Sequence, residues 1–188
     1  FDYLADIGPQ LNTVGDAGFT PRLAKSWTWA PDSMSIAFHL NERARWHDGK
    51  PVTASDVRFT FKILTDSALG SPIAATLGGI DSVTVRDSLT PVVWYAKRSP
   101  EQFFDFVYNA AVLPEHLLGN IPVKSLASSR FARQPVGSGR FRFAKWDGGS
   151  RIEIVSDTNN YRGRAKLDRV VWLITPDISA ATTRLLTG

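Results

Sequence analysis

The sequence lacks cysteine altogether and contains a single methionine. Without cysteine the chain can form no disulfide framework, no thiol nucleophile and no cysteine-ligated metal site. A long hydrophobic run is also missing, because the longest clearly apolar stretch, residues 170–174, is far shorter than the roughly 18 residues of a membrane-spanning helix. No signal peptide is visible, and the chain opens on Phe1 rather than methionine. We therefore expect it to have been cut from a longer protein.

What is present is an ordinary globular composition, with 43% hydrophobic and 21% charged residues in a chain of 188. This composition excludes a disordered chain, a coiled coil and a collagen-like repeat, and the length allows one domain or two small ones. The net charge of +4 is uneven, since residues 130–188 hold 11 basic and 5 acidic side chains. That segment raises the alternative of a basic module that binds nucleic acid or a membrane surface. A solvated protein face is the simpler interpretation, because no block of five like charges occurs.

The alternation of apolar and polar residues predicts several strands with helices between them. Residues 34–40 alternate clearly, which is typical of a half-buried strand. Thr53 and Asp56 have the spacing of a capping box and predict the start of a helix. The antiparallel hairpins indicate a mixed α/β (α+β) fold rather than a doubly wound parallel sheet. Further strands are predicted at 26–29, 80–86, 92–96, 140–146, 151–155 and 170–174, and further helices from Ser99, from Leu113 and near Asp177.

The helix that begins near Thr53 carries apolar residues on more than one face. Val57, Phe61 and Leu64 share one stripe, and Phe59 and Ile63 broaden it. A helix of this kind is expected to pack on two sides.

No group of residues in the sequence forms a recognisable catalytic or metal site. His39, His47 and His116 have no second ligand at metal-binding spacing on a shared helix face. Gly137-Ser138-Gly139 lacks the lysine of a phosphate-binding loop and does not match a nucleophile elbow. We therefore predict no catalytic residue, no metal, no cofactor and no enzymatic activity.

The basic and aromatic residues 140–143 allow a nucleic-acid platform as one interpretation, because aromatic rings stack on bases and arginines meet phosphates. The period of a strand, however, places Phe141 and Phe143 on one face and Arg140 and Arg142 on the other. We expect the two phenylalanines to face a core beneath a solvated pair of arginines.

Several stretches together carry a resemblance to a known family. Residues 21–27 read PRLAKSW, residues 44–57 read ARWHDGKPVTASDV, residues 135–141 read PVGSGRF, and residues 159–163 read NNYRG. Their order and spacing resemble those of the family 5 solute-binding proteins of ABC importers, the dipeptide-, oligopeptide- and nickel-binding group. The combined pattern is far more specific than any single motif.

The resemblance implies a lobe of the type II periplasmic-binding-protein kind, of which this chain is the N-terminal part. Residues 1–4 and 135–188 would belong to the main first lobe, residues 5–134 would form an inserted subdomain, and the second lobe would be absent. The implied function is the capture of a peptide or similar small solute outside the cytoplasm. The implied partners are that ligand and the ABC permease, with no nucleic acid and a monomeric state. The implied location is periplasmic or extracellular, and a lipid anchor is one option.

The resemblance also implies candidate ligand-binding residues. Asp2 and Tyr3 would lie at the cleft floor, Ile73 stands where peptide binders often have tyrosine, and Tyr108 and Asn109 would lie in a loop that approaches the ligand. For each of them, a buried or surface position without ligand contact is the alternative. Isoleucine in place of tyrosine leaves the peptide specificity open.

Overall fold

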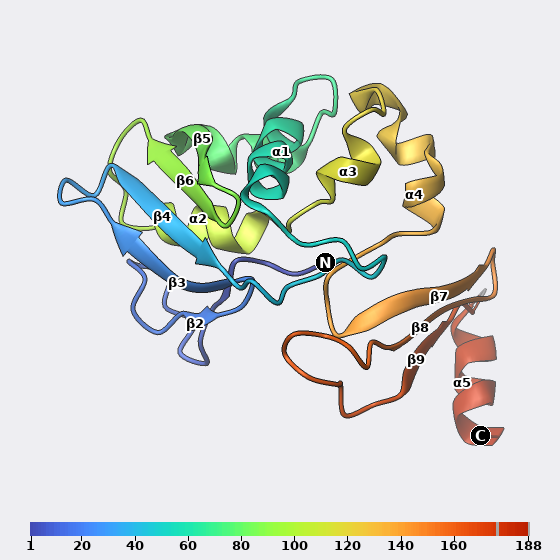
Figure 1. Ribbon diagram of the computed structural model, residues 1–188. Helices are drawn as coiled ribbons and strands as arrows, with labels where there is room; N and C mark the ends of the chain where they lie inside the picture. Colours follow the sequence, from blue (N-terminus) through green and yellow to red (C-terminus); the bar gives the residue numbers. More distant parts are fainter. Residues whose placement is uncertain (176, 188) are drawn as a thin grey trace.

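The computed structural model describes residues 1–175 and 177–187, whose strands form three antiparallel sheets. The first has two strands, the second has four in the order β3-β4-β6-β5, and the third has three in the order β7-β8-β9 (Figure 1). This arrangement confirms the mixed α/β fold class. The strands are β1 Ala5–Asp6, β2 Thr20–Pro21, β3 Ala24–Trp29, β4 Ser35–Leu40, β5 Ile80–Asp87, β6 Thr90–Tyr95, β7 Phe141–Asp147, β8 Arg151–Ser156 and β9 Arg169–Leu173.

The described helices lie between and around these strands. The α-helices are α1 Ala54–Thr65, α2 Gln102–Asn109, α3 Glu115–Leu118, α4 Arg130–Arg133 and α5 Ile178–Thr187, and three short 3₁₀ helices are η1 Pro72–Ala74, η2 Thr76–Gly79 and η3 Val123–Ser128.

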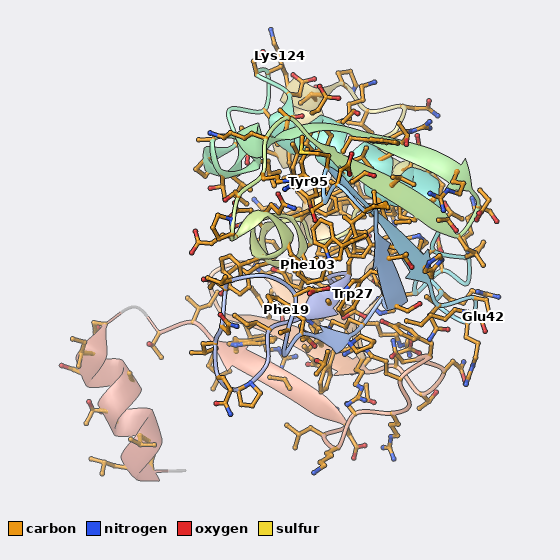
Figure 2. The ribbon with its side chains drawn as sticks, turned by 90° about the vertical axis from the view of Figure 1, so that its left-hand side faces the viewer. Phe19, Trp27, Glu42, Tyr95, Phe103 and Lys124 are labelled. Atoms are coloured by element: carbon orange, nitrogen blue, oxygen red, sulfur yellow. The ribbon has the colours of Figure 1, made fainter. Side chains whose placement is uncertain are left out.

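An aromatic core joins the four-stranded sheet to α2. Phe103 of α2 is fully buried, and its ring centroid lies 4.8 Å from that of Phe19 and 5.0 Å from that of Trp27. Figure 2 shows these three rings together with Tyr95 in the middle of the molecule. Every residue of the central strand β4 except His39 is buried. The predicted strand is confirmed over Ser35–Leu40, but the expected half-buried pattern is wrong, because this inner strand is covered on both faces.

Helix α1 begins with the predicted capping box and packs on two sides, as expected. The side chain of Asp56 accepts the backbone N–H of Thr53 at 2.8 Å. Val57 belongs to the main core, whereas Phe59 and Ile63 belong to a second, smaller core with Leu118 of α3. The helix therefore joins the main sheet to the α3–α4 segment.

Helix α2 starts later than the sequence indicates. Residues 99–101 precede the helix, which begins at Gln102. The Gln102 side chain nevertheless reaches back to Ser99, because its Oε1 accepts the Ser99 backbone N–H at 3.0 Å. The side chain thus fixes the approach to the helix rather than its first turn.

The three-stranded sheet is far less buried than the four-stranded sheet. Strand β9, the most apolar strand in the sequence, is mostly exposed, and its Trp172 is 51% exposed. The apolar side chains Ile178 and Leu185 of α5 are more than four-fifths exposed. Figure 2 shows α5 set apart from the remaining elements. Phe141 and Phe143 are half-buried and Arg140 and Arg142 exposed, in line with the expected faces of β7.

His47 links the two larger sheets. Its backbone N–H donates to the Gly137 carbonyl at 2.8 Å, its Nδ1 lies 3.2 Å from the Gly137 nitrogen, and its Nε2 lies 2.8 Å from the Gly139 oxygen. Within the three-stranded region, Asn160 Nδ2 donates to the Ser138 carbonyl at 2.9 Å and so holds the segment that His47 contacts. No described strand of the four-stranded sheet pairs with one of the three-stranded sheet. The division at residue 134 into inserted subdomain and main lobe stays a prediction.

Candidate ligand-binding site

Two of the predicted site residues, Tyr3 and Tyr108, line one pocket of about 550 Å³. Such a volume lies within the range of clefts that bind small molecules. We call it the Tyr3–Tyr108 pocket. Its lining consists of Tyr3, Ala5, Asp6, Ile7, Gly8, Pro9, Thr20, Arg22 and Tyr108.

An aromatic row forms one side of this pocket. Phe104 and Tyr108 lie one turn apart on α2, and their rings stack with centroids 4.8 Å apart. The Tyr108 ring also stacks on Tyr3, at 6.4 Å, while the Arg22 guanidinium lies 5.9 Å from the centre of the Tyr3 ring. Tyr108 is 55% exposed because Phe103 and Phe106 on the other face of α2 take the core positions. The Tyr108 ring thus lies between the rings of Phe104 and Tyr3 while much of its side chain stays exposed.

The opposite side of the pocket is the loop between β1 and β2. A Cβ atom on Gly8 would lie 2.3 Å from the Gly18 carbonyl oxygen, so the loop closes only with glycine at position 8. Asp16 holds the loop on the sheet, since its Oδ2 accepts the indole N–H of Trp27 at 2.7 Å and that of Trp29 at 3.0 Å. The pocket wall is thus tied to the aromatic core.

Asp2 lies behind the pocket in a buried ionic cluster. Only 1% of Asp2 is exposed. Its Oδ1 accepts a hydrogen bond from Arg162 Nη2 at 2.7 Å and lies 3.3 Å from Arg22 Nε, while its Oδ2 accepts from the Tyr161 hydroxyl at 3.1 Å. A charge this well buried needs such partners, which the protein itself supplies. A ligand that reached the Asp2 carboxylate would have to compete with them.

Two neighbours complete this cluster. Arg22 also pairs with Asp6, which lines the Tyr3–Tyr108 pocket, so one guanidinium connects the buried cluster to the pocket. Burial raises the pKa of the Tyr161 hydroxyl, and the adjacent Asp2 carboxylate raises that pKa further. Tyr161 therefore acts as a neutral donor toward Asp2.

The remaining predicted site residues do not line the Tyr3–Tyr108 pocket. Ile73 lies in η1 and packs, half-buried, against the main core. Asn109 uses its side-chain N–H₂ group to donate to the Asp105 carbonyl at 2.9 Å. The sequence placed Tyr108 and Asn109 in a loop, which is wrong, because both belong to the last turn of α2. Their contact with ligand, like that of Asp2, Tyr3 and Ile73, stays a prediction.

Several residues of this region were not singled out from the sequence. Arg22, Tyr161 and Arg162 stand within the quoted motifs, yet nothing local predicts that they meet Asp2, from which Arg162 is separated by 160 positions. The only signal was indirect, namely that a carboxylate in an apolar segment needs a cation if it is buried.

Two kinds of feature are absent from the described residues, a metal-binding cluster and a membrane-spanning helix. These residues contain no group of three or more histidine, aspartate or glutamate side chains able to hold a metal ion. None of the described helices combines the length and the apolar character required to cross a membrane.

The comparison with protein families decides the classification. The sequence model of the family described as "Bacterial extracellular solute-binding proteins, family 5 Middle" matches residues 18–188. The chain belongs to this family. The comparisons give no support to the alternative of a basic nucleic-acid-binding or membrane-surface module.

The names of individual relatives agree with this family assignment. This chain is 34% identical over 178 residues to a putative ABC transporter peptide-binding protein of Brucella ovis, covering 94% of the chain and 32% of the relative. It is 30% identical over 168 residues to the oligopeptide-binding protein AppA of Bacillus subtilis, covering 88% of the chain and 31% of AppA. The chain thus spans about a third of the length of the curated relatives it matches.

Solved structures show the same fold over the whole chain. The structure of Bacillus subtilis AppA in complex with a nonapeptide superimposes with a TM-score of 0.89 at 26% identity, covering 100% of this chain and 36% of AppA. The structure of NikZ from Campylobacter jejuni in complex with Ni(L-His) gives a TM-score of 0.85 at 26% identity, with the same coverage of both chains. These matches confirm the fold as that of periplasmic-type solute-binding proteins.

Proposed function

We propose that these residues form the N-terminal part of the first lobe of a solute-binding protein that captures a peptide or a similar small solute for an ABC importer. The observation that carries the proposal is the family match over residues 18–188. The names of the relatives support a peptide as the ligand, since one relative is an oligopeptide-binding protein whose structure contains a nonapeptide. NikZ with its Ni(L-His) ligand keeps other small solutes within the proposed class.

The proposal includes the permease partner and the location. A solute-binding protein of an importer works by carrying its ligand to membrane-embedded permease subunits, and the family's description as extracellular supports a periplasmic or extracellular site of action. A lipid anchor in the whole protein is a further prediction. Binding and delivery involve no bond making or breaking, so the proposal assigns no enzymatic role.

The Tyr3–Tyr108 pocket supplies the chemistry that a peptide needs. Exposed tyrosines offer large, rigid contact area together with a hydroxyl, a combination enriched at binding hot spots. Phe104 extends this surface along α2. We therefore assign ligand contact within this part of the lobe to Tyr3 and Tyr108.

A single lobe is expected to hold a ligand poorly. Binding sites for small ligands bury about 70–90% of the ligand surface, and a lobe on its own provides one wall. The cost of immobilising the ligand stays the same when half of the contacts are missing. The 188-residue chain alone should therefore bind peptides at least about tenfold more weakly than the whole protein, a difference of about 1.4 kcal/mol.

The test is calorimetric titration of the protein made from the whole reading frame with a mixed di- to pentapeptide library. Tyr108→Ala and Tyr3→Ala should each weaken binding about tenfold, whereas Tyr108→Phe, which keeps the ring, should have a small effect. Trp94→Ala removes another exposed aromatic ring, 44% exposed against 55% for Tyr108, from β6 and is the matched control. Absence of binding to any peptide, or equal losses in Trp94→Ala and Tyr108→Ala, would contradict the assignment.

A further inference from the structure

A second cavity of about 540 Å³ lies where the α3–α4 segment meets strand β7. It shares no lining residue with the Tyr3–Tyr108 pocket. Figure 1 shows α3 and α4 on the same side of β7. The chain that connects α4 to β7 runs between these helices and the strand. The lining consists of His47, Asp48, Leu117, Ile121, Arg130, Phe131, Gln134, Pro135, Val136, Arg142 and Phe143. The proposed peptide binding does not use this cavity.

One part of the lining is apolar. Phe131 and Ile121 pack, half-buried, on the small core of Phe59, Ile63 and Leu118, while Leu117 is left exposed at the surface. Phe143 contributes a half-buried ring from β7. An apolar group of a ligand that covered these side chains would remove their surface from water, which favours binding by roughly 25 cal/mol per Å² of apolar area.

The same cavity carries two arginines whose charges are not neutralised by a carboxylate. Arg130 donates through its Nε to Gln134 Oε1 at 2.9 Å, which orients the side chain and leaves its terminal nitrogens available. In the part of the chain that the structure describes, the Arg142 guanidinium has neither a hydrogen-bond nor an ion-pair partner. Arg142 and Phe143 both border the cavity because β7 is an edge strand of its sheet. Cations thus stand beside the apolar wall.

Asp48 is the one carboxylate in the lining, and its own oxygens are occupied. Its Oδ2 lies 2.7 Å from His116 Nε2, and its Oδ1 accepts the Lys50 backbone N–H at 3.1 Å. Burial raises the pKa of Asp48, but the hydrogen bonds from His116 and Lys50 outweigh this and lower it overall. An anionic ligand head is therefore disfavoured next to Asp48 and favoured beside the guanidiniums.

The surroundings add further positive charge. A neighbouring hollow of about 350 Å³ shares Gln134 and Phe143 with this cavity and is also lined by Arg133 and Lys145. Arg133 lies over the Trp146 ring at 4.5 Å, and Lys145 pairs with Asp147 at 3.0 Å. The cavity therefore opens within the most basic part of the chain, the part whose charge the peptide site does not use.

We propose that this cavity binds a small apolar carboxylate, that is, a molecule with one carboxylate head and an alkyl or aryl body. The planar fork of a guanidinium matches a carboxylate through two parallel hydrogen bonds, and such charge-assisted bonds are stronger than neutral ones. The head pairs with Arg142 or Arg130, and the body covers Phe131 and Phe143. A purely apolar ligand would leave the arginines unused, and a small inorganic anion would leave the apolar wall bare.

The experiment compares three ten-carbon probes, decanoate, decanol and decylammonium, by calorimetric titration of the 188-residue chain. The two ionic probes are kept below their micelle concentrations and decanol below its solubility limit. Decanoate should bind saturably, decanol at least tenfold more weakly, and decylammonium still more weakly. Arg142→Gln and Arg130→Gln should each weaken decanoate binding about tenfold. Asp48→Asn should strengthen it severalfold, because a repelling charge is removed. Arg43→Gln, an exposed arginine outside the cavity, is the charge-matched control and should leave binding unchanged.

Several results would overturn the proposal. Equal binding of decanoate and decylammonium would show that only apolar contact matters. Equal losses in Arg43→Gln and Arg142→Gln would show a general charge effect. Loss of decanoate binding in Tyr108→Ala would place the probe in the other pocket. Absence of decanoate binding in a chain whose circular dichroism shows it folded would also refute the site. None of these results bears on peptide capture by the whole protein, so the two proposals fail independently.

Discussion

The four-stranded and three-stranded sheets are built from equally apolar strands but differ in what covers them. Strand β4 is buried along nearly its whole length, because α2 brings Phe103 and Phe106 against the sheet. Strand β9 is at least as apolar, yet Trp172 and its neighbours face solvent in the described residues. The comparison teaches that the sequence pattern of a strand determines that it forms, whereas its burial depends on residues elsewhere that pack upon it.

The largest expected effect comes from truncating the centre of the buried sheet. Phe103→Ala should lower the free energy of unfolding by about 3–5 kcal/mol, because it leaves a cavity among four aromatic neighbours, Phe19, Trp27, Trp29 and Phe38. Trp172→Ala on β9 should lower it by less than about 1 kcal/mol, because that side chain is half exposed already. Urea unfolding of both variants measures the difference. A similar loss in the two would show that the sheets are equally packed.

The next effect concerns the ionic cluster that spans both regions. Asp2→Asn should cost about 3 kcal/mol of unfolding free energy, because Arg162 is then left partly buried without a carboxylate and Arg22 keeps only Asp6. Asp168→Asn removes an exposed partner of Arg164 in the three-stranded region and should change stability by no more than about 0.5 kcal/mol. Thermal unfolding of the two variants at neutral pH provides the measurement. If Asp2→Asn proved as mild as Asp168→Asn, the cluster would not hold the regions together.

The smallest expected effect is a loss of stability in acid from one carboxylate in each region. Hydrogen bonds from His116 and Lys50 lower the pKa of Asp48 despite burial, and the Lys145 and Arg151 side chains lower the pKa of Asp147. A lowered folded-state pKa stabilises the fold above the unfolded value of about 3.9, and this contribution is lost as pH falls through the folded value. Asp48→Asn and Asp147→Asn should each flatten the decline of the unfolding midpoint below about pH 4. If the unfolding midpoint of both variants declined in acid as steeply as that of the unmodified chain, the lowered pKa values of Asp48 and Asp147 would be contradicted.

Local signals predicted most of the fold. The alternation in residues 34–40 and the capping box of Thr53 and Asp56 act over a few residues, and the structure contains the strand and the capping box, although the strand is buried on both faces rather than one. The start of α2 differs because Pro100 and Glu101 form a turn in which Ser99 is bridged by Gln102 before the helix begins. Such differences arise where a side-chain contact replaces the first helical hydrogen bonds.

Less of the candidate site could be predicted. Tyr3 and Tyr108 come together because α2 presents one of its faces to the β1 segment, and this packing has no local signature. The burial of Asp2 also has no local signature, because its partners Tyr161 and Arg162 come from the far end of the chain. Contacts between residues so far apart in sequence depend on the complete topology, which periodicity alone does not determine.

The position of His47 between Gly137 and Gly139 has a consequence for spectroscopy. Its Nδ1 faces the Gly137 N–H and must offer a lone pair, whereas its Nε2 faces the Gly139 carbonyl and must carry the proton. The ring is thereby restricted to one tautomer, and the two ring nitrogens should give clearly separated signals in a long-range proton–nitrogen NMR spectrum. Each signal reports on the contact of His47 with one of these two glycines. The imidazole of His47 is therefore a built-in probe of whether the two sheets remain joined.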